Sequence, residues 1–367
     1  MNVQFSETQE MLRTSAREFL AENSPASLTR EMRDDPTGYS TTLWNALADL
    51  GWTGLCLPEA HGGSDMSLLD FCLLQEELGR ACAPTPFIPT MAAAMAIARF
   101  GSAAQRSDVL PRVARGEAVV VAAVEHRRDA EGVEETVSAT LRGDGFRLDG
   151  TVDFAPWANS AEAVLCPVTL GAEGQQRVML VPTDATGVSL TPLRNAAGPH
   201  RLWRMELDSV SVERESVLPD SDEQAIEFTR TVLDAAHCCD TVGALTYVLE
   251  ATVAYANERR QFGQTIGSFQ VIQHYCADMH VMLEGLRMSA YKAAWSLDEH
   301  TSTSRDVVIA SAYAHEVVPR ILNLAHQIHG AMGVTYEHDL HLYTTRATPP
   351  AHDLLPLAAY LETMHAS

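Results

Sequence analysis

The chain has 367 residues, 46% of them hydrophobic and 20% charged, which is typical of a globular protein that buries a large core in two or three domains. Its 26 basic and 48 acidic residues give a formal net charge of −22, which opposes binding to nucleic acid or to an anionic membrane. The seven cysteines lack CxxC spacing and indicate reduced thiols, and no window approaches the roughly 20 apolar residues of a membrane span. We therefore expect a cytoplasmic protein.

The first third of the chain has the periodicity of helices. Ser6 and Gln9 form a potential capping box ahead of apolar residues at three- and four-residue spacing. Further helical runs are expected at 40–50, 67–81, 90–100 and 104–115. The pattern predicts an N-terminal helical domain over residues 1–116.

Short β-rich segments follow, separated by Gly, Asp and Pro. They are AVVVAAVE, TVSATLR, GFRLDGTVDF, AVLCPVTL, RVMLVPT and GVSLTPL. Their residue types and turn signals predict a central antiparallel β domain over residues 117–219.

Helical periodicity resumes after the segment SVLPD, which we interpret as a linker ending at Asp220. Helices are expected at 221–258, 268–298, 302–330 and 353–364. Runs of this length predict a C-terminal helical bundle domain over residues 220–367. The predicted fold class is α+β.

Two polar motifs lie within the predicted bundle. ERRQFGQTIGSFQ, residues 258–270, resembles the R-x-x-F-G-x-x-I-x-x-F-Q element of the acyl-CoA dehydrogenase family. QIHGAMGVTYEHDLHLY, residues 327–343, resembles the Q-x-H-G-G-x-G element of the same family. The resemblance extends over the whole chain and includes LGWTGLCLPEAHGGSDMSLLD and GDGFRLDGTVDFAPWANSAEAVLC.

The resemblance implies a homotetramer, or a related dimer of dimers, that binds FAD and removes two hydrogens from Cα and Cβ of an acyl-CoA. It also implies an electron-transferring flavoprotein as the acceptor. Each flavin of this family spans two subunits: its ring lies against the β domain of one chain, and its diphosphate and adenosine reach the bundle of the neighbour.

By this analogy Arg259 pairs with the diphosphate, because a planar guanidinium suits phosphate oxygens. Phe262 and Phe269 pack against the cofactor, and Gln270 hydrogen-bonds it. Close approach of the backbone to the cofactor is assigned to Gln327, Ile328, His329, Gly330 and Ala331. Taken singly, each of these residues also fits a polar contact between two helices, and their shared order and spacing favours the cofactor site.

The catalytic base of the family is missing from its usual positions. A carboxylate there removes the α-proton of the substrate, but at the two positions that members use this chain has Leu233 and Leu354. Asp234 and Asp353 are one residue out of register, which turns a helical side chain by about 100°. Both are weak candidates for the base, and a solvated helix face or a helix cap is the simpler interpretation.

The segments that contact the flavin ring also depart from the family. VEHRRDAE, residues 124–131, replaces T-E-P-x-x-G-S-D, so that Val124 and Ala130 stand where hydroxyl groups are common. The family's W-I-T strand is replaced by Phe154, Ala155 and Pro156, and the proline removes a backbone donor.

The residues for the diphosphate and adenosine are therefore kept, whereas those for the ring, the substrate and the base are lost. This asymmetry favours a non-catalytic, β-type subunit of an α2β2 heterotetramer, in which a catalytic acyl-CoA dehydrogenase subunit completes the site. The segment HGAMGVTYEHDLHLY resembles heteromeric actinobacterial enzymes of steroid side-chain degradation, which implies a bulky CoA thioester as the substrate.

Two other hypotheses stay open. One is a self-sufficient homotetrameric dehydrogenase with Asp234 or Asp353 as an atypical base. The other is a non-redox scaffold or acyl-binding protein with this fold. No metal site is expected, because the histidines lack the spacing to carboxylates that metal motifs have.

Overall fold

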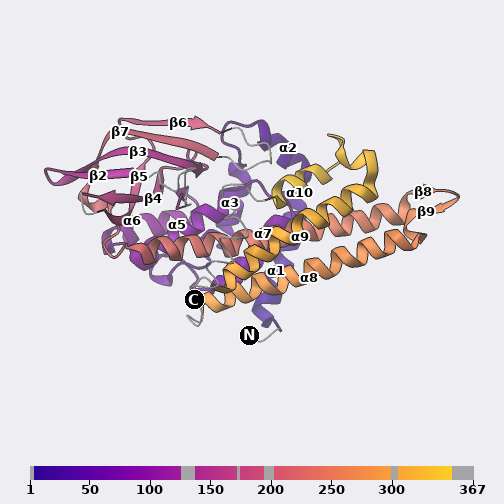
Figure 1. Cartoon of the computed structure of the whole chain (residues 1–367). Helices are drawn as coiled ribbons and strands as arrows, with labels where there is room; N and C mark the ends of the chain where they lie inside the picture. Colours follow the sequence, from indigo (N-terminus) through magenta and orange to yellow (C-terminus); the bar gives the residue numbers. More distant parts are fainter. Residues whose placement is uncertain (1–3, 125–136, 172–173, 194–201, 299–304, 349–367) are drawn as a thin grey trace.

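A computed structural model of the chain describes residues 4–124, 137–171, 174–193, 202–298 and 305–348. Helices precede and follow a curled sheet, and the last long helices extend away from that sheet (Figure 1). The predicted α+β fold class is confirmed. Within the described ranges, no helix is long and apolar enough to cross a membrane.

Serine side chains begin most of the N-terminal helices. Ser6, Ser67 and Ser102 each accept from the third residue of their helix, whose own side chain bonds back in a capping box. The helix after Pro25 has no side-chain cap, and the sequence did not predict it. The helices are α1 (Glu7–Asn23), α2 (Ala26–Asp34), α3 (Thr41–Asp49), α4 (Leu68–Arg80), α5 (Phe87–Phe100) and α6 (Ala103–Ala114).

Seven strands within the described residues form one sheet. They are β1 (Val120–Ala122), β2 (Val137–Arg142), β3 (Gly145–Pro156), β4 (Ala163–Leu170), β5 (Gln175–Pro182), β6 (Val188–Pro192) and β7 (Leu202–Glu213). Most pairs are antiparallel, but β4 runs parallel to both β1 and β2, so the sheet is mixed rather than purely antiparallel. One edge of β4 is shared: residues 163–165 pair with β1 and residues 168–170 pair with β2, on either side of Pro167.

Four helices and a small hairpin make up the described C-terminal part. They are α7 (Glu223–Glu258), β8 (Arg260–Gln261), β9 (Gln264–Thr265), α8 (Gln270–Asp298), α9 (Arg305–His329) and α10 (Leu340–Ala347), with a 3-10 turn, η5 (Gly330–Val334), before α10. The first three helices match the predicted runs to within a few residues. The run predicted at 353–364 lies outside the described residues.

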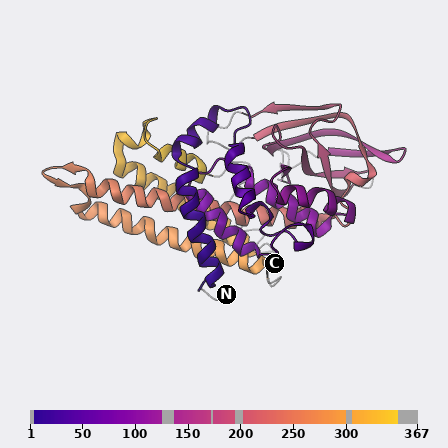
Figure 2. The same cartoon turned by 180° about the vertical axis from the view of Figure 1, so that it is seen from behind.

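Helix α7 connects the two helical parts. It packs against α4 and α5 on one side and against α8, α9 and α10 on the other. The crossing with α4 is so close that a Cβ added at Gly243 would lie 1.9 Å from the carbonyl oxygen of Glu76, and one at Gly79 would lie 2.2 Å from that of Asp240. Glycine on both helices therefore lets the backbones touch. From behind, α1 covers the face opposite to α9 (Figure 2).

A buried ion pair reinforces this junction. The guanidinium of Arg346 on α10 donates to Asp240 on α7 at 2.7 Å and to the carbonyl oxygen of Ala83 at 2.8 Å. Gln75 on α4 donates to the same carboxylate at 2.6 Å. Because every charge in this cluster has hydrogen-bonding partners, its burial is compensated.

Candidate functional site

The first polar motif forms the outer end of the helical bundle, which we call the arm (residues 259–270). Strands β8 and β9 pair Gln261 with Gln264, leaving a two-residue loop of Phe262 and Gly263 with φ of 52° and 83°. Two positive φ values in a two-residue hairpin loop are those of a type I′ turn. The N–H of Ile266 closes the hairpin by donating to the carbonyl oxygen of Arg259 at 2.8 Å.

Phe262 is held at the tip of the arm in a conformation that costs energy. Its side chain is 92% exposed, and its ring meets that of Phe269 edge to face at 6.2 Å between centroids. Asn, Asp and Gly are the residues that favour positive φ, and a large aromatic residue there is a backbone outlier of the kind that clusters at ligand contacts. The tip therefore presents an apolar ring to the solvent, where a ligand or another chain can reach it.

The arm also carries two arginines without acidic partners. Arg259 and Arg260 are exposed, and no hydrogen bond or ion pair of their guanidinium groups occurs among the described residues. Arg346 and Arg287, by contrast, are paired with carboxylates. Gln270, the first residue of α8, is also exposed. Unpaired guanidinium groups in a chain of net charge −22 fit the diphosphate of a cofactor.

The second polar motif ends α9 and forms η5. Gly330 has φ of 60°, and a Cβ added there would meet nothing within 4 Å, so its backbone faces open space. Gly333 is enclosed, because an added Cβ would lie 2.8 Å from Cβ of His329 and 3.0 Å from a methyl carbon of Leu340. Gln327 and Ala331 are exposed, whereas Ile328 is buried. The turn thus has one open side, where an anion can approach the main chain.

His329 fixes this turn to the end of α7. Its Nε2 lies 3.2 Å from Oγ1 of Thr252, and that hydroxyl donates to the carbonyl oxygen of Val248 at 2.6 Å. Nε2 must therefore carry the proton and donate it to Thr252. The ring stacks on Tyr255 at 4.5 Å, and the Tyr255 hydroxyl donates to the carbonyl oxygen of His329 at 3.5 Å.

Burial keeps the imidazole of His329 neutral. Desolvation, with smaller contributions from His338 and His326, lowers the pKa of His329 to about 4. A neutral, buried ring supports the turn rather than exchanging protons near pH 7. Thr252 and Tyr255 belong to no motif, and the only sequence signal for them is their three-residue spacing on the face of α7 just before Arg259.

The two motifs begin from neighbouring parts of the bundle. Tyr255 contacts His329 one helical turn before Arg259, so the arm and η5 leave the bundle from the same region. Figure 1 places this region at the opposite end of the molecule from the sheet. The seven-stranded sheet thus lies at the other end of the molecule from the arm.

The sheet residues predicted to lie near the flavin ring are only partly described. Residues 125–131 lie outside the described ranges. In β3, Val152 pairs with Met205 and Ala155 with Trp203, so Asp153 and Phe154 form a bulge opposite a single residue of β7. Phe154 has φ of 58° at this bulge, and Pro156 ends the strand.

Leucine, and not a carboxylate, occupies both sequence positions at which the family has its catalytic base. Leu233 is 5% exposed and packs in the core along α7. Asp234, the next residue, is half-buried on the same helix. Leu354 and Asp353 lie outside the described residues. A search of the described ranges finds no group of His, Cys, Asp and Glu side chains suited to a metal ion.

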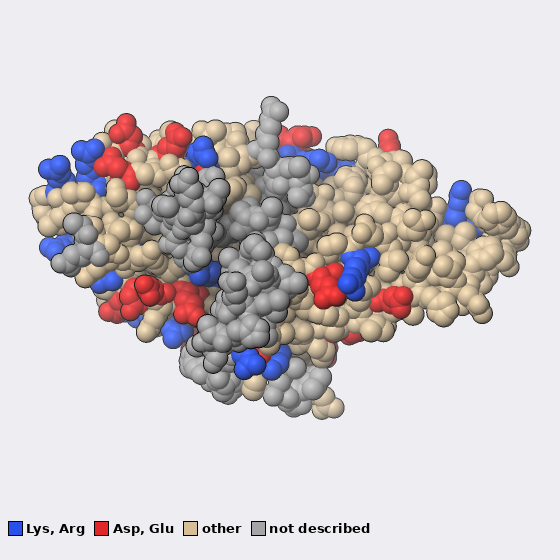
Figure 3. Space-filling view, viewed as in Figure 1, with Lys and Arg blue, Asp and Glu red and all other residues tan. Residues whose placement is uncertain are grey.

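Exposed apolar side chains concentrate on the C-terminal helices and turns. We call this set the bundle face: Val253, Phe262, Val271, Val281, Met288, Met332, Val334 and Tyr336. Figure 3 shows few charged side chains over the arm and the neighbouring end of the bundle, whereas charges gather over the sheet. An uncharged surface with exposed apolar residues is typical of a contact with another chain.

Two family models match the chain. The one described as acyl-CoA dehydrogenase, N-terminal domain, matches residues 6–117, and the one described as acyl-CoA dehydrogenase, C-terminal domain, matches residues 227–349.

Curated relatives of similar length carry the same family name. The chain is 29% identical to the probable acyl-CoA dehydrogenase YngJ of Bacillus subtilis, over 92% of both chains. It is 28% identical to the acyl-CoA dehydrogenase IpdE2 of Mycolicibacterium smegmatis, over 98% of this chain and 99% of the relative.

Solved structures match over nearly the full length. A variant of the Tcur3481–Tcur3483 steroid ACAD is 29% identical with a TM-score of 0.86, covering 98% of this chain and 99% of that one. The ChsE4–ChsE5 complex from Mycobacterium tuberculosis is 26% identical with a TM-score of 0.92, covering 100% of this chain and 98% of that one.

Proposed function

Because this chain belongs to the acyl-CoA dehydrogenase family, whose cofactor is FAD, we propose that it is the non-catalytic subunit of a heteromeric acyl-CoA dehydrogenase. In this proposal the arm and η5 bind the diphosphate and adenosine of an FAD whose ring rests on a catalytic partner chain. The assembly is an α2β2 heterotetramer that introduces a double bond between Cα and Cβ of an acyl-CoA.

The separation of the arm from the sheet is the observation that supports a cofactor site shared between two chains, and the leucine at the base position, described below, supports a partner that differs from this chain. The arm, which carries Arg259 and the exposed Phe262, lies at the opposite end of the molecule from the chain's own sheet, as the labels of β8 and β9 in Figure 1 show. A cofactor held at the arm therefore has to place its ring on another chain. The bundle face includes Phe262 of the arm and supplies apolar surface for that chain.

The residues of this chain act by binding and positioning. Arg259 neutralises the diphosphate, Phe262 packs against the cofactor, and Gly330 admits it to the main chain. His329 and Tyr255 hold η5 against α7, so the two contacts keep a fixed spacing. FAD held there would supply the acceptor for the hydride that leaves Cβ of the acyl group, while a base takes the proton from Cα.

The proton-abstracting carboxylate belongs to the partner in this proposal. Leu233 packs in the core and has no group that accepts a proton, and the bulge at Phe154 alters the strand that would back the ring. Support for a heteromer comes from the similar ChsE4–ChsE5 complex and from the similar steroid ACAD. A bulky steroid side-chain thioester is the proposed substrate, and an electron-transferring flavoprotein is the proposed acceptor.

The proposal is tested by measuring visible absorbance and flavin content for the chain expressed alone and for the chain co-expressed with a candidate catalytic dehydrogenase. The lone chain should be colourless and inactive, and the complex should carry about one flavin per pair of different chains. A full flavin load and turnover by the lone chain would contradict the proposal. Loss of that turnover in Asp234→Asn would then support a homomeric enzyme with an atypical base.

A further inference from the structure

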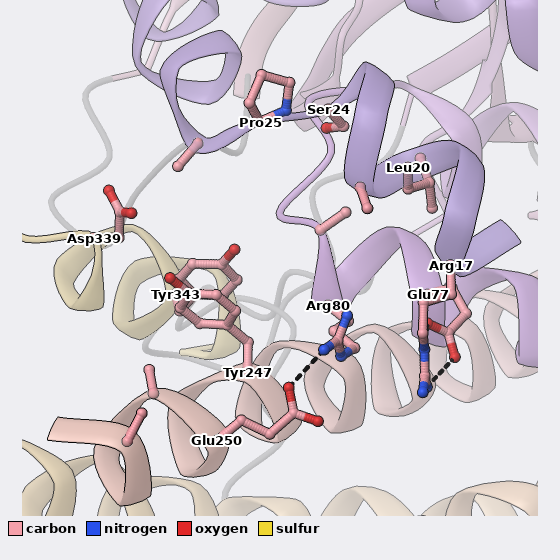
Figure 4. A pocket seen from close by; sticks show the side chains of 15 residues that line it. Arg17, Leu20, Ser24, Pro25, Glu77, Arg80, Tyr247, Glu250, Asp339 and Tyr343 are labelled. Atoms are coloured by element: carbon pink, nitrogen blue, oxygen red, sulfur yellow. Dashed lines mark hydrogen bonds and ion pairs between the residues drawn. The ribbon is translucent and has the colours of Figure 1, made fainter. Parts of the chain in front are cut away.

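A cavity of about 510 Å³ lies between the N-terminal helices and the bundle. Its walls come from α1, the turn before α2, α4, α7 and α10, and no lining residue comes from the sheet or the arm. Its volume is within the range of about 300–1,000 Å³ that small-molecule sites occupy. Figure 4 shows side chains from these separate segments around the same space.

The charged groups of the cavity cancel one another. Arg80 donates to Glu250 at 2.6 Å, and Arg17 donates to Glu77 at 2.7 Å. Asp339 forms an ion pair with Arg30, which stands outside the lining. No charge is left over for a charged ligand to neutralise, so the cavity favours a neutral molecule.

A buried hydroxyl in the wall has no partner. Ser24 is 4% exposed, and among the described residues its Oγ makes no hydrogen bond, although the backbone N–H of the same residue donates to Leu20. Nε of Arg80 is likewise buried without a hydrogen-bond partner. Buried polar atoms in native proteins are nearly always satisfied, so an orphan hydroxyl at a cavity wall points to a bound molecule that supplies its partner.

Two aromatic rings form another wall. Tyr247 and Tyr343 stack with 3.7 Å between centroids and an interplanar angle of 11° (Figure 4). Within the described part of the chain, neither phenol hydroxyl has a hydrogen-bond partner. Much of the remaining lining is alanine, including Ala21 and Ala251, which leaves room without adding polar atoms.

From these walls we propose that the cavity binds a neutral, flat and mostly apolar molecule that carries one or two hydroxyl or carbonyl groups. The tyrosine rings contact its flat body, and the hydroxyl of Ser24 hydrogen-bonds its oxygen. This site uses none of the residues assigned to FAD, and its test needs no flavin.

The test uses 2-naphthol as the probe and the full-length chain in the assembly in which it is purified. Isothermal titration should show one saturable site per chain with a Kd on the order of 1 mM or tighter. 2-Naphthoate has the same ring system with a negative charge and should bind more weakly. No saturable binding of 2-naphthol, or tighter binding of 2-naphthoate, would overturn the proposal.

Variants assign the binding to this cavity. Ala251→Phe on α7 and Ala21→Phe on α1 fill it from two different walls, and each should abolish binding of 2-naphthol. Ser24→Ala should weaken binding about five- to tenfold, while Ser27→Ala, an exposed serine outside the lining, should leave it unchanged. Binding that persists in both filled variants would place the probe elsewhere and overturn the proposal.

Thermal unfolding separates a ligand contact from a structural one. Because the hydroxyl of Ser24 has no partner in the protein, Ser24→Ala should leave the Tm of the free chain unchanged or raise it. A lower Tm with unchanged affinity for 2-naphthol would show that the hydroxyl serves the fold, and the proposed contact would be wrong.

Discussion

At the scale of single residues, the presence or absence of a nearby carboxylate distinguishes an exposed arginine that is already paired from one that can bind an anion. Arg259, directly after α7, and Arg320, on α9, are both exposed arginines of the C-terminal part. Arg320 has Glu316 at 2.9 Å, one helical turn away, whereas Arg259 has no acidic partner among the described residues. An exposed ion pair contributes little to stability, but an unpaired guanidinium remains available to an anion.

We predict that Arg259→Gln weakens FAD binding by the co-purified complex roughly tenfold or more, because it removes a charge-assisted hydrogen bond to the diphosphate. Flavin absorbance per chain after dialysis measures this. Arg320→Gln is the matched control and should retain its flavin. Equal flavin content in the two variants would remove Arg259 from the site.

His329 predicts a defined pH dependence. Burial lowers the pKa of His329 to about 4, below the ordinary value of roughly 6.5 that applies when the chain is unfolded. The neutral ring therefore stabilises the fold fully above pH 6.5, and this contribution is lost as the pH falls toward 4. The difference in unfolding free energy between the unchanged chain and His329→Gln should shrink over that range.

Urea titrations at several pH values test this prediction. His280→Gln, at an exposed position of α8, is the control for the loss of a histidine side chain. A constant difference for His329→Gln would mean that the ring takes up a proton freely in the folded chain.

The sequence could suggest Arg259, Phe262 and Gln270 as cofactor residues because they stand at fixed positions of a motif, and this assignment stays a prediction. It could not identify Thr252 and Tyr255, because threonine and tyrosine on a long helix have no distinctive pattern. The tautomer of His329 depends on Thr252 donating to Val248, which is a property of the folded helix alone. Residues that hold a site in place from within the fold, such as Thr252 and Tyr255, are therefore harder to predict than residues of a motif.

At the scale of elements, the hairpin of the arm is destabilised locally by the positive φ of Phe262, whose ring is exposed at the tip. We predict that Phe262→Asn stabilises the lone chain by up to about 1 kcal/mol, because Asn tolerates positive φ better than Phe. The same change should lower the flavin content of the complex. Thermal unfolding of the lone chain and flavin absorbance of the complex measure the two effects.

Leu141→Asn is the control for this change, because Leu141 is an exposed apolar residue of the sheet, far along the chain from the arm. It should alter neither flavin content nor assembly. An unaltered flavin content in Phe262→Asn would show that the ring makes no contact with the cofactor.

Elements with strong local signals were predicted well, and those fixed by tertiary contacts were not. Serine caps marked α1 and α4, whereas α2 lacks one. Strand β7 escaped prediction because it is polar and Ser209 interrupts it with φ of 58°. The parallel pairing of β4 was also missed, since alternation specifies the faces of a strand and not its neighbours.

At the scale of the whole molecule, apolar exposure is unequal between the two ends. Most of the large exposed apolar residues within the described ranges belong to the bundle face. The division into domains at 1–116, 117–219 and 220–367 stays a prediction, since one continuous core runs through the helices and the sheet. The family fold was predictable from motifs, whereas the role of the bundle face in assembly stays a proposal.

We predict that Val281→Asp prevents assembly with the catalytic chain and leaves the stability of the lone chain within about 0.5 kcal/mol, because the side chain is 70% exposed. Sedimentation of the co-expressed chains measures assembly. Leu141→Asp on the sheet should assemble normally. Normal assembly of Val281→Asp would exclude this part of the bundle face from the contact.

The cluster around Asp240 has a consequence for how the protein is made. Gln75 and Asp240 leave the ribosome well before Arg346, which follows Asp240 by 106 residues. Until then the carboxylate has no cation, and burying it at the crossing of α4 and α7 is unfavourable. We expect a ribosome-stalled chain that ends at residue 340 to remain sensitive to protease, and one that has released residue 346 to become resistant. The native junction of this protein would then form only after residue 346 has left the ribosome.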